Sequence, residues 1–135
     1  MTALKAGISY FAVVFASGFV LGAFRVLVLA PSVGETGALA IELPVMLALS
    51  WIVCLWLVRA QAVPESTAAR VVMGASAFVL LMAAEAALAV IVFGRSLMQH
   101  LAGFRVANAQ IGLVAQAAFA AFPLIQLWLA RRGRA

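Results

Sequence analysis

The chain has 135 residues, of which 67% are hydrophobic and only 10% are charged, and its formal net charge is +5 at pH 7. This composition excludes a water-soluble globular domain, which needs far more polar side chains to cover its surface. The basic residues lie at the ends of apolar stretches, where the orientation of membrane helices explains them, so nucleic acid is not an expected partner.

Four apolar stretches of about 20 residues or more occupy most of the chain, and each is long enough to cross the hydrocarbon core of a bilayer. They predict an all-α membrane protein, a four-transmembrane-helix up-down-up-down bundle whose residues 1–135 form a single integral membrane domain. The predicted spans are about 6–30, 38–58, 70–93 and 107–130.

The first stretch is interpreted as a retained span rather than a cleaved signal peptide, because the apolar run is too long and Pro31 directly follows the candidate cleavage site. It contains Gly18-Phe-Val-Leu-Gly22, a GxxxG pattern that lets two helices approach closely. Arg25 falls on the same face, seven residues after Gly18. We therefore expect helix packing at Gly18 and Gly22, with Arg25 facing protein rather than lipid.

The three connections between the spans differ in character. Residues 31–37 contain one proline and two glycines, which predicts a turn, and residues 59–69 are polar and form the clearest break. In the third connection, Ser96 and Gln99 have the spacing of a capping box, and apolar residues follow at helical intervals. This pattern predicts a short helix lying in the membrane interface.

Costly polar side chains recur within the spans at similar predicted depth, in the outer half of the membrane. A lone charge near the centre of a membrane helix costs about 2.5–3.5 kcal/mol, so such groups are expected to pair or to face a hydrated cavity. The candidate ligand-binding or ion-pair cluster is Arg25, Glu42, Glu85, Gln116 and Asn108.

Three interpretations of this cluster stay open at the level of the sequence. In the first, the side chains line a hydrated pocket in which an anion or a polar head group meets Arg25. In the second, Arg25 forms a structural ion pair with Glu42 or Glu85 that fixes the register of the helices. In the third, Arg25 extends toward the lipid surface.

The distribution of basic residues predicts how the chain is oriented, because cytoplasmic loops are enriched in Lys and Arg. Six such residues fall on the side of the termini and two on the other, which predicts that both termini are cytoplasmic. The arginine-rich, alanine-rich composition favours a bacterial inner (plasma) membrane. The six are Lys5, Arg59, Arg70, Arg131, Arg132 and Arg134, and the two are Arg95 and Arg105.

No sequence pattern of a catalytic, metal or cofactor site is found, since the single histidine, His100, and the single cysteine, Cys54, have no partner ligands at suitable spacing. An enzyme is therefore not expected, and a lipid-modifying enzyme is only the third hypothesis. The leading hypothesis is a protein that binds or permeates a small ion or polar solute through an outer-facing polar pocket. The alternative is a non-catalytic accessory or assembly subunit of a larger membrane complex. The expected partners are the lipid bilayer and either further copies of the chain or that larger complex.

Overall fold

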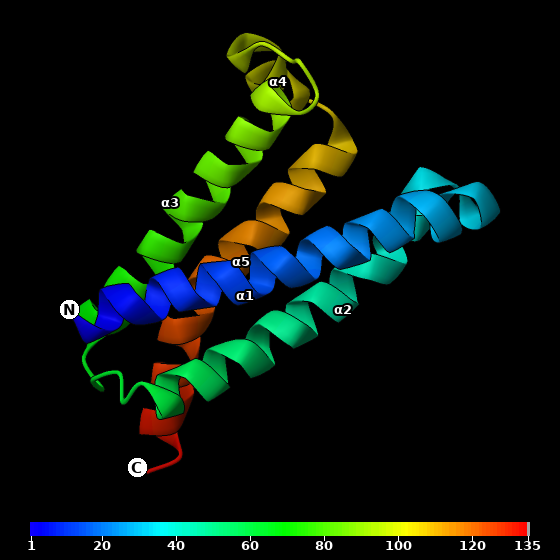
Figure 1. Ribbon diagram of the computed structural model, residues 1–135. Helices are drawn as coiled ribbons and strands as arrows, with labels where there is room; N and C mark the ends of the chain where they lie inside the picture. The colour runs from blue at the N-terminus through cyan, green and yellow to red at the C-terminus, as the bar shows by residue number, and fades with distance from the viewer. Residues whose placement is uncertain (135) are drawn as a thin grey trace.

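The computed structural model describes residues 1–134, and those residues are helical between short connections, with no strand among them (Figure 1). The predicted all-α class is confirmed. The long helices alternate in direction, so that both termini lie at the opposite end from α4 (Figure 1). The elements are α1 (Thr2–Phe24), the π-helical turn η1 (Arg25–Leu29), α2 (Ala30–Ala60), α3 (Thr67–Ile91), α4 (Leu97–Gly103) and α5 (Ala107–Arg132).

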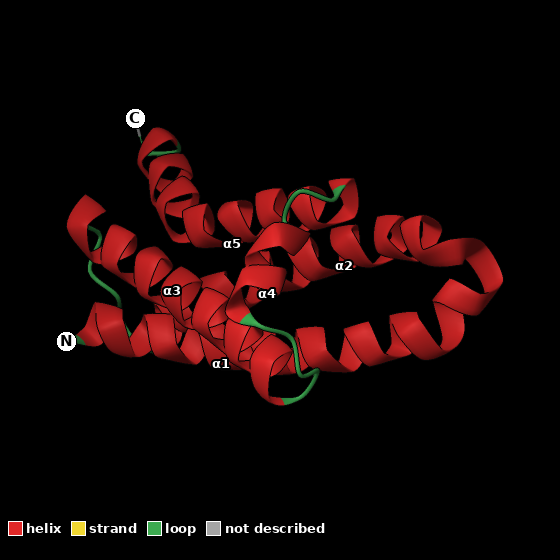
Figure 2. Cartoon of the chain, turned by 90° about the horizontal axis from the view of Figure 1, so that it is seen from above, coloured by secondary structure: helices red, strands yellow, loops and turns green. Residues whose placement is uncertain are grey.

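The first connection is more helical than its sequence predicted. Residues 31–37 lie within α2, and the chain reverses at Gly34, whose φ of 78° and ψ of 166° are not helical. A positive φ is accessible to glycine because it lacks a Cβ atom. The expected turn between spans 6–30 and 38–58 is therefore a single glycine break, and α1 and α2 form a hairpin whose closed end lies far from the termini (Figure 2).

Arg25 begins the π-helical turn, a feature that the sequence pattern did not predict. A π-helical turn inserts one extra residue into the helical repeat and often marks a functional position. The side chains of this turn are exposed or half-buried, and its backbone joins α1 to α2 without interruption.

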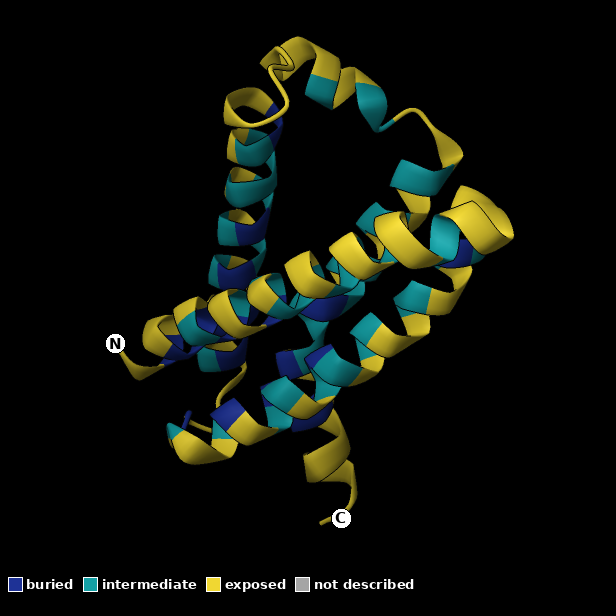
Figure 3. Cartoon of the chain, turned by 45° about the vertical axis from the view of Figure 1, so that its right-hand side comes forward, coloured by how far each residue is buried: buried dark blue, intermediate teal, exposed yellow. Residues whose placement is uncertain are grey.

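The four long helices pack in a ring in which α1 contacts α2 and α3, and α5 also contacts α2 and α3. Buried residues gather where these helices cross (Figure 3). The largest fully enclosed side chains in this core are Tyr10, Met73, Pro123 and Cys54, and Phe119 is 3% exposed. We call this region, on the side of the termini, the packed half of the molecule.

Two glycines allow the helices of the packed half to approach closely. A Cβ atom on Gly7 would lie 2.7 Å from the Met73 carbonyl oxygen, and one on Gly74 would lie 2.0 Å from the Ala120 carbonyl oxygen. Neither distance is tolerable for real atoms, so α1–α3 and α3–α5 contacts depend on glycine at these positions.

The close backbone approach expected at Gly18 and Gly22 is not found there. A Cβ atom on Gly18 would meet only the flexible end of Met46, at 3.1 Å from Cε, and one on Gly22 would meet only Glu42 Oε1, at 3.9 Å. The face that holds the two glycines does meet protein, but through side chains of α2 rather than through a helix backbone.

The short helix predicted in the third connection is present as α4, and it packs against α3. Its capping box is complete: the Gln99 amide donates to the Ser96 hydroxyl at 3.2 Å, and the Ser96 amide donates to Gln99 Oε1 at 3.0 Å. These two bonds satisfy backbone donors that would otherwise be free at the start of a helix.

Three helical segments are long and apolar enough to cross a membrane. They are Thr2–Ala60, Thr67–Ile91 and Ala107–Arg132, and the first includes the reversal at Gly34. These properties are those of a membrane protein in general.

Candidate functional site

A cavity of about 740 Å³ lies between the long helices in the half of the molecule that is remote from the termini, which we call the open half. Four of the five polar residues singled out from the sequence line this cavity, although they come from η1, α2, α3 and α5. They are Arg25, Glu42, Glu85 and Gln116.

Arg25 forms an ion pair with Glu42, through Nε and Oε2. The Arg25 side chain is 30% exposed and the Glu42 side chain is 12% exposed, so water screens this pair only in part. The structure contains the pairing of Arg25 with Glu42 named in the second interpretation, and it also places the four side chains around one cavity. Because Glu42 already neutralises the guanidinium, Arg25 is poorly suited to attract an anion into the cavity.

Glu85 has a neutral partner. Gln116 Nε2 donates a hydrogen bond of 2.6 Å to Glu85 Oε1, across the interface of α3 and α5. Among residues 1–134, Glu85 forms no ion pair, and the buried Gln116 Oε1 accepts no hydrogen bond. The cavity therefore presents one carboxylate without a basic partner and one amide oxygen without a donor.

Glu85 lies on the inner face of α3. Gly74, Ala77 and Leu81 precede it at helical spacing on the same side, and all three are buried. Gln116 follows Gly112 by one turn on α5, and both line the cavity. The amide and the carboxylate thus meet where α3 and α5 both face the cavity.

Asn108 is the member of the predicted cluster that does not line the cavity. Its Nδ2 atom donates a long hydrogen bond, 3.4 Å, to the Thr36 hydroxyl near the start of α2. This contact joins the beginning of α5 to the reversal at Gly34. Asn108 thus connects two elements beside the cavity rather than lining it.

The rest of the cavity wall is predominantly apolar, and four phenylalanines contribute to it: Phe15, Phe19, Phe93 and Phe119. The sequence reasoning did not single them out, because phenylalanine is common in apolar helices and its spacing did not distinguish it. Aromatic faces attract cations, most strongly where water is excluded. Together with Glu85, these rings give the cavity features that suit a positively charged, partly apolar molecule.

One boundary between the cavity and the packed half depends on a residue that the sequence reasoning missed, Tyr10. Pro123 lacks an amide hydrogen, so the carbonyl of Phe119, four residues earlier, loses its helical donor. The Tyr10 hydroxyl supplies the missing donor at 3.0 Å. The Tyr10 ring also stacks on Phe119, with centroids 4.2 Å apart. The only sequence signal was that Tyr10 is the single tyrosine.

Within residues 1–134, no group of three metal-binding side chains comes together. His100 packs edge-on against Phe104, with ring centroids 5.2 Å apart. In comparisons with protein-family models, curated proteins and solved structures, no family model, no curated protein and no solved structure matches this chain.

Proposed function

We propose that this chain is a membrane protein that crosses the bilayer four times and binds a small amphipathic cation in the cavity of the open half. The observation behind the ligand class is that Glu85 is a carboxylate without a basic partner in a predominantly apolar, aromatic-lined cavity whose one arginine is paired with Glu42. Binding of this kind would serve a carrier or a permeation pathway for small polar solutes.

The reversal at Gly34, which divides Thr2–Ala60 into two antiparallel helices, supports the four-span arrangement. Both termini and the second connection then lie on one side of the membrane. The excess of Lys and Arg at that end favours the cytoplasm of a bacterium, with the cavity toward the outer leaflet. Residues 97–103 of α4 would then lie in the outer interface.

The chemistry of the cavity favours a cation over an anion. Arg25 is already neutralised by Glu42, whereas Glu85 has only the Gln116 amide as a partner. An ammonium or phosphonium group would gain Coulomb attraction to Glu85 and contact with the phenylalanine faces. An N–H donor on the ligand would in addition satisfy Gln116 Oε1. The volume of about 740 Å³ falls within the range of small-molecule sites, roughly 300–1,000 Å³.

The test is a binding titration of the full chain in lipid nanodiscs with tetraphenylphosphonium and, separately, tetraphenylborate, two ions of similar shape and opposite charge. We expect saturable binding of the phosphonium alone. Glu85→Gln should weaken that binding at least about tenfold, equivalent to roughly 1.4 kcal/mol, since it removes the charge while keeping the shape. Glu35→Gln is the matched control, because Glu35 is exposed, lies outside the cavity and should not change the affinity.

Equal phosphonium affinity in the wild type and in Glu85→Gln would overturn the assignment of Glu85 as the counter-charge. Preferential binding of tetraphenylborate would show that the cavity selects anions, against the proposal. If neither ion binds and a second protein co-purifies in constant ratio from native membranes, the accessory-subunit hypothesis replaces this one.

A further inference from the structure

At the end of the molecule that holds the termini, Arg70 lies in the first turn of α3 with only 4% of its surface exposed. Its Nε atom donates to the Pro64 carbonyl oxygen at 3.3 Å, and its Nη1 atom is enclosed but has no hydrogen-bond partner among the described residues. A buried guanidinium with an unused donor is costly, because its lost hydration is only partly replaced. This position therefore lacks an acceptor that a bound molecule could supply.

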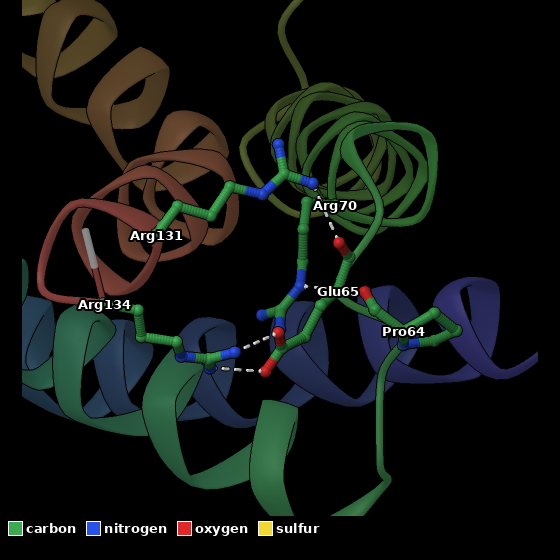
Figure 4. Close-up of polar contacts among 5 residues, drawn as sticks. All are labelled: Pro64, Glu65, Arg70, Arg131 and Arg134. Atoms are coloured by element: carbon green, nitrogen blue, oxygen red, sulfur yellow. Dashed lines mark hydrogen bonds and ion pairs between the residues drawn. The ribbon is translucent and has the colours of Figure 1, made fainter.

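Two further arginines come from the end of α5 (Figure 4). Arg134 donates two hydrogen bonds of 2.8 Å to the Glu65 carboxylate, and Arg131 donates to the Glu65 carbonyl oxygen at 2.9 Å. The hydrogen bonds from Arg134 hold the pKa of Glu65 below its usual range, so Glu65 is ionised at neutral pH. Three guanidinium groups thus lie near one carboxylate, which accepts its hydrogen bonds from Arg134, and this leaves an excess of positive charge beside the connection.

A shallow apolar groove of about 310 Å³ leads away from Arg70 along the outside of α3 and α5. Because the two helices are antiparallel, Arg70 and Leu124 mark the end of the groove nearer the termini. Arg131 bridges the helices at that end, since its Nη1 atom also donates to the Thr67 hydroxyl at 3.4 Å. Half of the residues that line the groove are alanines: Ala75, Ala117, Ala120 and Ala121.

We infer that this groove and the arginines at its end form a binding site for an anionic phospholipid. One acyl chain would lie along the alanine-lined groove, and the phosphate would contact Arg131 and supply the acceptor that Arg70 Nη1 lacks. Arg–phosphate pairs are among the stronger hydrogen-bonded contacts in proteins. Clustered basic residues beside membrane helices attract anionic lipids of the cytoplasmic leaflet.

A lipid explains the groove and the charge together, whereas free phosphate would use only the arginines. The inference rests on the proposed insertion into a membrane, but it does not depend on the cavity or on Glu85. Alkaline extraction of native membranes checks the insertion separately, and phosphonium binding to each variant checks the cavity separately. Failure of either is therefore distinguishable from failure of the lipid site.

Native mass spectrometry of the full chain in mild detergent, with added phosphatidylglycerol or phosphatidylcholine, tests the lipid site. We expect the wild type to retain phosphatidylglycerol at least fivefold more strongly than phosphatidylcholine. Arg131→Gln should abolish that preference, because it removes a guanidinium at the mouth of the groove. Ala117→Phe should weaken the binding of phosphatidylglycerol, because Ala117 is exposed and a phenyl ring there fills the groove.

The matched controls are Arg105→Gln, an arginine at the opposite end of the molecule, and Val114→Phe, which adds a ring on α5 outside the groove. Both should bind phosphatidylglycerol as the wild type does. Equal retention of the two lipids by the wild type would overturn the inference, and so would undiminished binding in Ala117→Phe. Full competition by glycerol phosphate, which has the head group without acyl chains, would show a free-phosphate site and contradict a lipid site.

Discussion

The two halves of the bundle are built from the same helices but differ in how closely those helices approach. In the packed half, glycines bring backbones together at Gly7 and Gly74, and Tyr10 is completely enclosed. In the open half, the same helices enclose a cavity whose wall includes an ion pair and a carboxylate. The packed half therefore holds the helices in place, and the open half presents polar groups to a cavity.

Because the two halves pack differently, we expect stability to depend mainly on the packed half and ligand binding to depend on the open half. In a close-packed region, extra volume and the loss of a hydrogen-bond partner both lower stability. A region with a cavity tolerates added atoms, and its polar residues are available to a ligand. Substitutions should therefore separate the two halves by their effect on unfolding and on binding.

The largest expected effect distinguishes Gly74 from Gly22. Gly74→Ala places a Cβ atom against the Ala120 backbone and should destabilise the protein by about 3 kcal/mol, the upper end of the cost of overpacking. Gly22→Ala adds the same atom where the nearest neighbour is 3.9 Å away, and it should be neutral or slightly stabilising because alanine favours helix. Free energies of unfolding, measured in detergent micelles, compare the two variants. Equal losses of unfolding free energy in both variants would contradict the difference in packing between the halves.

The next effect concerns the hydroxyl of Tyr10. Tyr10→Phe leaves the Phe119 carbonyl buried without a donor and should cost about 2 kcal/mol of unfolding free energy. Pro123→Ala restores an amide that can donate to the same carbonyl, so Tyr10→Phe should cost much less in that background. A double-mutant cycle measured by thermal unfolding gives the coupling, and strict additivity would show that the hydroxyl is not compensating for the proline.

A smaller coupling is expected between Arg25 and Glu42. Either Arg25→Gln or Glu42→Gln leaves its partner charged and alone, whereas the double substitution removes both charges. The double variant should therefore be more stable than the sum of the single losses implies, by about 1 kcal/mol, because the pair is partly exposed to solvent. The measurement is the chemical unfolding of the wild type, the two single variants and the double variant. A coupling free energy of zero would mean that the ion pair contributes nothing to stability.

The smallest effect concerns the Glu65–Arg134 contact at the surface of the packed half. The Arg134 hydrogen bonds lower the pKa of Glu65, so its contribution to stability is present above the ordinary glutamate pKa of about 4.3 and is lost as the pH falls through the lower, folded value. Wild type should be slightly more stable than Glu65→Gln at neutral pH, and the two should converge as the pH falls through the lowered pKa of Glu65. Melting temperatures measured across this range test the sign, and a gap that widens in acid would contradict it.

Periodicity and length were sufficient to predict the helices, because an apolar helix in lipid needs little tertiary information. The capping box at Ser96 and Gln99 was also predictable, since both of its hydrogen bonds are local. The predicted turn at residues 31–37 included residues that are helical in the structure. The sequence does not show that one glycine, Gly34, is enough to reverse the chain.

The site was predictable in part. Depth within the helices indicated that Arg25, Glu42, Glu85 and Gln116 belong together, and all four line one cavity. Their partners were not predictable, because the choice of Glu42 rather than Glu85 for Arg25 depends on how α1 and α2 rotate against each other. The π-helical turn at Arg25 and the donor from Tyr10 to Phe119 also depend on contacts between distant helices.

The most direct test of a ligand-accessible cavity with Glu85 as its counter-charge is thiol labelling of Gly112→Cys by a maleimide, with and without tetraphenylphosphonium. Gly112 lines the cavity with open space around it, whereas the natural Cys54 is fully buried and provides the unlabelled background. We predict labelling at position 112 that the phosphonium slows, and no slowing once Glu85→Gln is added. A cysteine at position 112 that stays unlabelled, or that reacts at the same rate whether or not the cation is present, would contradict the account.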